Sequence, residues 1–173
     1  AISDEEVEIK WTADFAISED ISDDFESHDA FKINSGGPTG WGYMDNDGSA
    51  TYGFEGIGFP GSSEAMAFIV FDPSQTTPPM TSSSPGIIAH SGNKFLASFA
   101  AVSGQNDDWL ISPRLNFGTD FKFSFWAKSY MANYGLERFR VFYSTHDESD
   151  WIQVTAGDYI EAPVTWTLYE YTI

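Results

Sequence analysis

The chain has 173 residues, with eight Lys and Arg against 26 Asp and Glu, a formal net charge of −18 and no cysteine. This length fits one domain, which can bury roughly two-thirds of the surface of its unfolded chain. The charge argues against nucleic acid and anionic membranes as partners, because both are bound through cationic side chains. The lack of cysteine excludes disulfides and thiol chemistry.

The chain begins with an acidic segment, residues 1–22, ahead of a main domain expected at residues 23–173. Residues 1–29 hold eleven acidic side chains and one base, Lys10. Such a run is either a solvated segment or one whose charge a divalent cation partly neutralises. Within it, Val7–Phe15 alternates apolar and polar residues and predicts an extra half-buried strand.

Alternation with a period of two continues along the rest of the chain, whereas helical periodicity is nearly missing. Together with 15 glycines and 17% aromatic residues, this profile is typical of many short strands joined by tight turns. The predicted strands are Ala65–Phe71, Lys94–Val102, Trp109–Ser112, Phe121–Lys128, Glu137–Thr145, Trp151–Thr155 and Thr165–Ile173. Eight or more strands at this spacing favour an all-β sandwich of two packed sheets.

Two stretches are expected on the surface. In the strand Phe121–Lys128 the phenylalanines share one face, so Trp126 on the other face is expected to be partly exposed or covered by a loop. The Pro- and Ser-rich stretch Asp72–Gly86 predicts a long surface loop, because proline cannot donate to a strand ladder. No run of 18 apolar residues is present, so no membrane-spanning helix is predicted.

The turn Asp45-Asn46-Asp47-Gly48-Ser49 places carboxylates at alternate positions before a glycine that can take a positive φ. Oxygen ligands in that arrangement suit calcium. An EF-hand is excluded, because helices do not flank the turn and Gly56 stands where the loop's last ligand, a Glu, belongs. The same residues also form an ordinary β-turn, so both interpretations remain open.

Four motifs occur in order: Asp108–Pro113 (DWLISP), Ser124–Tyr130 (SFWAKSY, following Phe123), Val141–Ser144 (VFYS) and Trp166–Tyr171 (WTLYEY). With Phe25-Glu26 and Gly40-Trp41 upstream, they make the chain resemble the bacterial cleaved-adhesin, or choice-of-anchor J, domains. These domains are surface proteins of Bacteroidetes with some similarity to MAM domains. The resemblance covers about Asp23 to Ile173, although the family usually continues with another strand.

The resemblance implies a jelly-roll sandwich of two antiparallel sheets, secreted or held at the cell surface. It also implies a structural calcium between an early strand and neighbouring loops. On this basis Asp24 and Glu26 are the expected ligands, and Asp45, Asp47 and Asp107 are further candidates. Trp41 and Tyr43, which lie beside glycines, are expected in loops where they could contact a sugar or protein ligand.

Catalytic motifs are not found in the sequence. The three histidines lack metal-ligand spacing, and Ser91 is not part of a nucleophile elbow. We therefore expect a noncatalytic extracellular module that adheres to host or extracellular proteins and belongs to a longer surface protein. A carbohydrate-binding module and a structural spacer are the alternatives. A broad exposed apolar patch would favour a protein ligand, and an aromatic platform beside a polar groove would favour a sugar.

Overall fold

The computed structural model describes residues 5–7, 21–80, 87–115, 121–145 and 150–173. Within these ranges the chain is nearly all β, and its one helical element is the short 3-10 helix η1 (Pro73–Gln75). The strands are β1 (Glu5–Val7), β2 (Gly42–Asp45), β3 (Ile69–Phe71), β4 (Phe95–Ala97), β5 (Asp108–Ile111), β6 (Lys122–Ala127), β7 (Arg138–Tyr143), β8 (Ile152–Gln153), β9 (Ile160–Glu161) and β10 (Thr167–Thr172).

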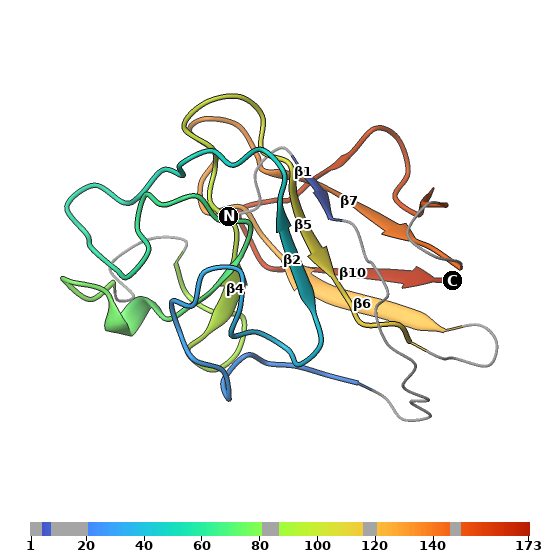
Figure 1. The fold of residues 1–173 in the computed structure, drawn as a ribbon, viewed down its shortest axis with the longest axis horizontal. Coiled ribbons are helices and arrows are strands. Elements are labelled where there is room, and N and C mark those ends of the chain that lie inside the picture. The colour runs from blue at the N-terminus through green and yellow to red at the C-terminus, as the bar shows by residue number, and fades with distance from the viewer. Residues whose placement is uncertain (1–4, 8–20, 81–86, 116–120, 146–149) are drawn as a thin grey trace.

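The strands form several small sheets (Figure 1). In the largest, β7 pairs in parallel with β1 and antiparallel with β8 and β9. The other ladders are antiparallel pairs: β2 with β5, β3 with β4, and β6 with β10. An all-β fold is thus confirmed. Some strand partners lie far apart in the sequence: β2 and β5 are separated by more than 60 residues.

The first hydrophobic core lies around β3 and β4 and is built mainly from aromatic rings. Phe71, which is fully buried, contacts Phe59 edge-on at 5.1 Å between ring centroids and Phe99 at 5.8 Å. Phe54 and Phe31 pack against the same cluster. Edge-to-face geometry of this kind is the favoured arrangement of aromatic pairs.

A second core lies between β7 and the β6–β10 ribbon. Phe139 and Val141 of β7 are fully buried there, and Phe125 and Tyr169 pack against them from the ribbon. The alternation predicted for β6 is confirmed, because Phe123 and Phe125 face this core while Trp126 is 45% exposed on the other side.

The stretch Asp72–Gly86 differs from the predicted surface loop. In its described part, residues 72–80, the side chains of Thr76 and Met80 are buried, and Met80 belongs to the first core. Asp72 caps η1 by accepting a hydrogen bond from the Ser74 backbone at 3.0 Å, which allows this polar segment to pack inward.

The predicted acidic segment and its extra strand lie mostly outside the described residues. Of the strand predicted at Val7–Phe15, only Val7 is described, as the last residue of β1. The described residues contain no helix that could span a membrane.

Candidate functional site: a carboxylate cluster and an aromatic surface

The predicted acidic turn forms directly after β2. Asp45 Oδ1 accepts a hydrogen bond from the Gly48 backbone at 2.7 Å, and Asp47 Oδ1 accepts one from the Ser49 backbone at 2.8 Å. Gly48 has φ 60°, the left-handed conformation that glycine adopts without strain. These bonds fold the turn and fix both carboxylates at the end of the strand.

The β2–β5 ladder brings a third carboxylate to this turn. Its register places Asp108 directly opposite Asp45. One carboxylate oxygen from each of Asp45, Asp47 and Asp108 lies within 4.8 Å of the other two. Asp108 is only 2% exposed, so its charge is shielded from water and close to two other negative charges.

Buried polar groups orient Asp108. Its Oδ2 accepts hydrogen bonds from Ser98 Oγ at 3.1 Å and from Asn106 Nδ2 at 3.2 Å. Asn106 Nδ2 also donates to the Phe99 carbonyl at 3.0 Å, which ties the carboxylate to the chain that leaves β4. A carboxylate held in this way is a preorganised ligand group.

Asp107, a predicted ligand, has a different role. Its side chain accepts a hydrogen bond from the Trp109 indole, and its backbone N–H donates to Asp47 Oδ2 at 2.8 Å. Its carbonyl accepts a bond from the Asn46 backbone at 2.9 Å. Asp107 therefore links the acidic turn to β5. Its neighbour Asp108, which was not among the expected ligands, belongs to the cluster instead.

The cluster of Asp45, Asp47 and Asp108 could hold a metal ion. Three carboxylates supply hard oxygen ligands only, a set that suits calcium, magnesium or manganese better than zinc or copper. Two oxygens that bind one calcium ion lie at most about 4.6–5.2 Å apart, because each Ca–O distance is about 2.3–2.6 Å. The spacing of the cluster meets that requirement.

Asp24 and Glu26 are not part of this cluster, and their carboxylates accept hydrogen bonds from backbone N–H groups. Asp24 Oδ1 accepts a bond from the Glu26 backbone at 3.1 Å. Glu26 Oε1 accepts two backbone bonds, from Lys94 at 2.6 Å and Asn93 at 2.7 Å. These two bonds lower the pKa of Glu26, and the bond from Lys94 has the larger effect.

The ammonium group of Lys94 lies beside the Glu26 backbone. Lys94 Nζ donates to the Glu26 carbonyl at 2.9 Å and to the His28 carbonyl at 2.7 Å. This lysine therefore links the early segment to the residues just before β4. Calcium binding by Asp24 and Glu26 stays a prediction.

The two aromatic residues predicted in loops occupy different settings. Tyr43 lies within β2, opposite Leu110 of β5, and burial raises its pKa to about 12. Its hydroxyl lies against Gly37, where an added Cβ would collide with it. The loop placement of Tyr43 is therefore wrong, because its ring fills space between segments. Trp41, which is half-buried, does precede the strand.

An aromatic surface lies instead on the outer face of the β6–β10 ribbon. Trp126 pairs across the strands with Leu168, and the His90 imidazole stacks on its indole with a centroid distance of 4.0 Å. The Trp166 ring lies 6.0 Å from His90, and its Nε1 donates to the Ile88 carbonyl at 2.9 Å. We call Trp126, Leu168, His90, Trp166 and Ile88 the ribbon patch.

Comparisons of the chain with protein-family models, with curated proteins and with solved structures found no match.

Proposed function

We propose that this domain is a noncatalytic extracellular binding module that adheres to a protein through the ribbon patch. The similarity of its motifs to cleaved-adhesin domains supports a jelly-roll arrangement and a place in a longer surface protein. The observation that carries the proposal is the exposure of apolar side chains on the β6–β10 ribbon and on the adjoining segment that holds Ile88. Trp126 is 45% exposed, Leu168 41% and Ile88 56%.

The patch has the character of the centre of a protein interface. Tryptophan is the residue type most enriched among interface residues that contribute strongly to affinity. His90 and Trp166 hold the surroundings of Trp126 in a defined geometry, and Lys128 Nζ lies 5.9 Å from the Trp166 ring. A rigid, mainly apolar surface of this kind loses little conformational entropy when a partner covers it.

The same proposal assigns a structural calcium ion to Asp45, Asp47 and Asp108. The oxygen-only donor set and its spacing support this assignment. Calcium bound there would offset the repulsion among the three carboxylates and would stabilise the turn between β2 and β5. In this proposal the calcium ion stabilises the fold, and the ribbon patch contacts the partner protein.

Binding to immobilised collagen, fibronectin and laminin tests the protein-adhesion proposal. Trp126→Ala should lower the affinity for the bound protein by roughly thirtyfold, equivalent to about 2 kcal/mol for an interface anchor. The matched control is Tyr52→Ala, which removes another exposed aromatic ring away from the patch. Both variants must melt like the unmodified protein. Equal losses of affinity, or none, would exclude the ribbon patch.

A glycan array run beside the protein panel tests the carbohydrate-binding alternative. Selective binding of a glycan, lost in Trp126→Ala and retained in Tyr52→Ala, would assign the patch to sugar recognition instead of protein adhesion. Failure to bind in both panels would favour the spacer alternative.

A further inference from the structure

The ladder between β6 and β10 leaves every second residue of β10 with its backbone N–H and C=O groups facing away from β6. Phe121 and Ile173, just beyond the two strands, exchange both backbone hydrogen bonds, each at 3.0 Å. In an antiparallel ladder such pairs alternate with pairs that exchange none. By the register, the residues of β10 that bond to β6 are therefore Thr167, Tyr169 and Tyr171. The residues that direct their backbone groups outward, which we call the β10 edge, are Leu168, Glu170 and Thr172.

Within the described residues, the β10 edge has no partner. β6 is the only described strand beside β10, and none of the backbone hydrogen bonds formed by described residues involves the outward groups. The side chains of the same three residues are exposed. An unpaired strand edge is a template on which another strand can form main-chain hydrogen bonds. The β10 edge is therefore a place where an extended segment of another chain can bind.

A strand added to the β10 edge would lie beside two different surfaces. On the outer face, its side chains would lie next to Leu168, which belongs to the ribbon patch, and next to Glu170. On the inner face, they would lie next to Tyr169 and Tyr171, which pack against the second core. Because side chains alternate between the two faces of a strand, the segment that fits is apolar on its inner face and matched to Leu168 and Glu170 on its outer face.

Charge favours the β10 edge over the opposite edge of the ribbon. On β6, Lys122 begins the strand and Lys128 directly follows it, and lysines on an edge strand act against the addition of a further strand. The one charged side chain of β10 is Glu170, in a domain with a net charge of −18. Glu170 forms an ion pair with Lys122, yet its side chain remains 44% exposed and its two oxygens can accept further bonds. A basic segment therefore suits β10 better than β6.

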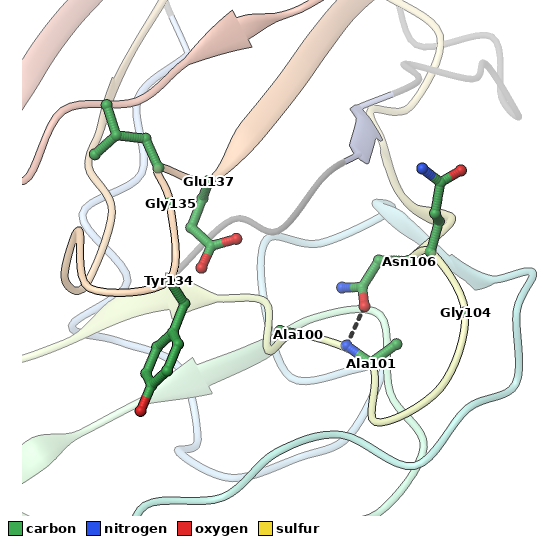
Figure 2. Close-up of a pocket in the computed structure, with 9 residues that line it drawn as sticks. Ala100, Ala101, Gly104, Asn106, Tyr134, Gly135 and Glu137 are labelled. Carbon is green, nitrogen blue, oxygen red and sulfur yellow. Dashed lines mark hydrogen bonds between the residues drawn. The ribbon is translucent and has the colours of Figure 1, made fainter.

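A strand edge accommodates a partner segment that the small cavity of the domain cannot. This cavity, lined by residues 100–101, 104–106 and 134–137, has a volume of about 190 Å³ (Figure 2). Its volume is below the roughly 300–1,000 Å³ of sites for drug-sized ligands. A segment that runs along the six residues of β10 is about 20 Å long, so it needs an open edge.

We infer that an extended segment of a basic protein partner adds to the β10 edge as a further strand, with a basic side chain beside Glu170 and an apolar one beside Leu168. Main-chain hydrogen bonds supply the affinity in this mode of binding, and the alternating side chains supply the specificity. A second copy of the domain suits the edge less well, because each copy carries a net charge of −18. This inference names the part of the partner that contacts the ribbon, and so rests on the proposed protein-binding function.

Hydrogen exchange of backbone amides tests the edge without an adhesion ligand. The probe is a short synthetic peptide with blocked ends, in which valine alternates with threonine, arginine and leucine. With the peptide at about ten times its dissociation constant, the amides of the β10 edge should exchange roughly tenfold more slowly, because they exchange from the unbound fraction. The outward amides of β6, which serve as the internal control, should not change: Lys122, Ser124 and Trp126.

Two N-methylated forms of the peptide separate main-chain pairing from side-chain contact. One form is methylated at every second residue and the other at the residues between, so that one loses the N–H groups that face β10 and the other loses those that face away. One form should bind like the unmodified peptide, and the other roughly a hundredfold more weakly, as expected for the loss of a few hydrogen bonds. Equal binding of the two forms would overturn the inference and leave adhesion through the ribbon patch to its own test.

A proline on each edge of the ribbon gives a matched pair of variants. Glu170 and Ser124 lie opposite each other, and the N–H of each faces away from the ladder, so proline at either position spares the bonds between β6 and β10. Glu170→Pro should abolish peptide binding, and Ser124→Pro should not. Glu170→Gln, which does not depend on a proline being accommodated, should weaken binding roughly two- to fivefold, whereas Glu55→Gln removes a charge elsewhere and should not.

Four results would overturn the inference. They are peptide binding that survives in a folded Glu170→Pro variant, slower exchange on the β6 edge instead of the β10 edge, no slowing on either edge, and equal effects of Glu170→Gln and Glu55→Gln. Slowing of the β10 amides when the protein alone is concentrated would assign the edge to a second copy of the domain, which also contradicts a basic partner segment. In each case the binding of adhesion ligands to Trp126→Ala remains a separate measurement.

Discussion

The buried carboxylate of Asp108 allows its structural role and its proposed ion-binding role to be separated by two substitutions. Asp108→Ala leaves the donors of Ser98 and Asn106 without this acceptor in a buried place. An unsatisfied buried donor costs about 1–3 kcal/mol, so the unfolding free energy should fall by about 2–6 kcal/mol. That is a large part of the about 5–15 kcal/mol that stabilises a typical domain.

Asp108→Asn should have the opposite effect in chelator. Its amide oxygen can still accept both bonds, and the substitution removes one of three clustered charges. Without calcium this variant should therefore unfold at the same urea concentration as the unmodified protein or at a higher one. With calcium at a hundred times its dissociation constant, only the unmodified protein should gain about 2.7 kcal/mol.

Urea unfolding followed by tryptophan fluorescence, in chelator and in calcium at matched ionic strength, measures both effects. Because Asp108→Ala and Asp108→Asn both remove the charge, a difference between the two variants below about 1 kcal/mol in chelator would contradict the buried hydrogen bonds. An equal calcium response in Asp108→Asn and the unmodified protein would show that the cluster is not the ion site. Sodium at the same ionic strength should reproduce neither response.

Three further predictions concern single side chains. Burial raises the pKa of Tyr43 to about 12. The protonated phenol therefore contributes its full stability below pH 10, and this contribution is lost as the pH rises through the folded pKa. Tyr43→Phe should flatten the resulting fall of the melting temperature at alkaline pH. The backbone hydrogen bonds of Lys94 and Asn93 lower the pKa of Glu26. The ionised carboxylate therefore contributes to stability above the unfolded pKa of about 4.5, and this contribution is lost as the pH falls through the folded pKa. Glu26→Gln should remove that acid dependence, measured by urea unfolding between neutral and acidic pH. Phe71→Ala should lower the unfolding free energy by about 3–5 kcal/mol, measured by urea unfolding, and a loss below about 1 kcal/mol would contradict its central place in the first core.

The sequence predicts the long strands well because alternation reports which face is buried. β6 and β7 fall within the strands predicted at Phe121–Lys128 and Glu137–Thr145. β2 was missed, since Gly42-Tyr43-Met44-Asp45 begins with glycine and has no β-branched residue. Its strand conformation depends on pairing with β5, a partner that local patterns do not indicate.

The same limit applies to the candidate site. The turn at Asp45 and Asp47 is readable in the sequence, but the choice between Asp107 and Asp108 depends on strand register. Adjacent residues in a strand point to opposite sides, so a shift of one residue exchanges their roles. The indole of Trp109, two positions beyond Asp107, was the one local feature that could have indicated where the Asp107 side chain turns.

The two hydrophobic cores draw on different parts of the chain. All members of the first except Tyr130 lie from Phe31 to Phe99, and the second takes all of its members from Phe123 onward. We therefore expect one part to open at lower free energy than the other, although the ribbon patch joins them. In native-state hydrogen exchange, the amides of β3 and β4 should form one protection class and those of β6, β7 and β10 another. Mild denaturant should then separate the two classes before either is lost.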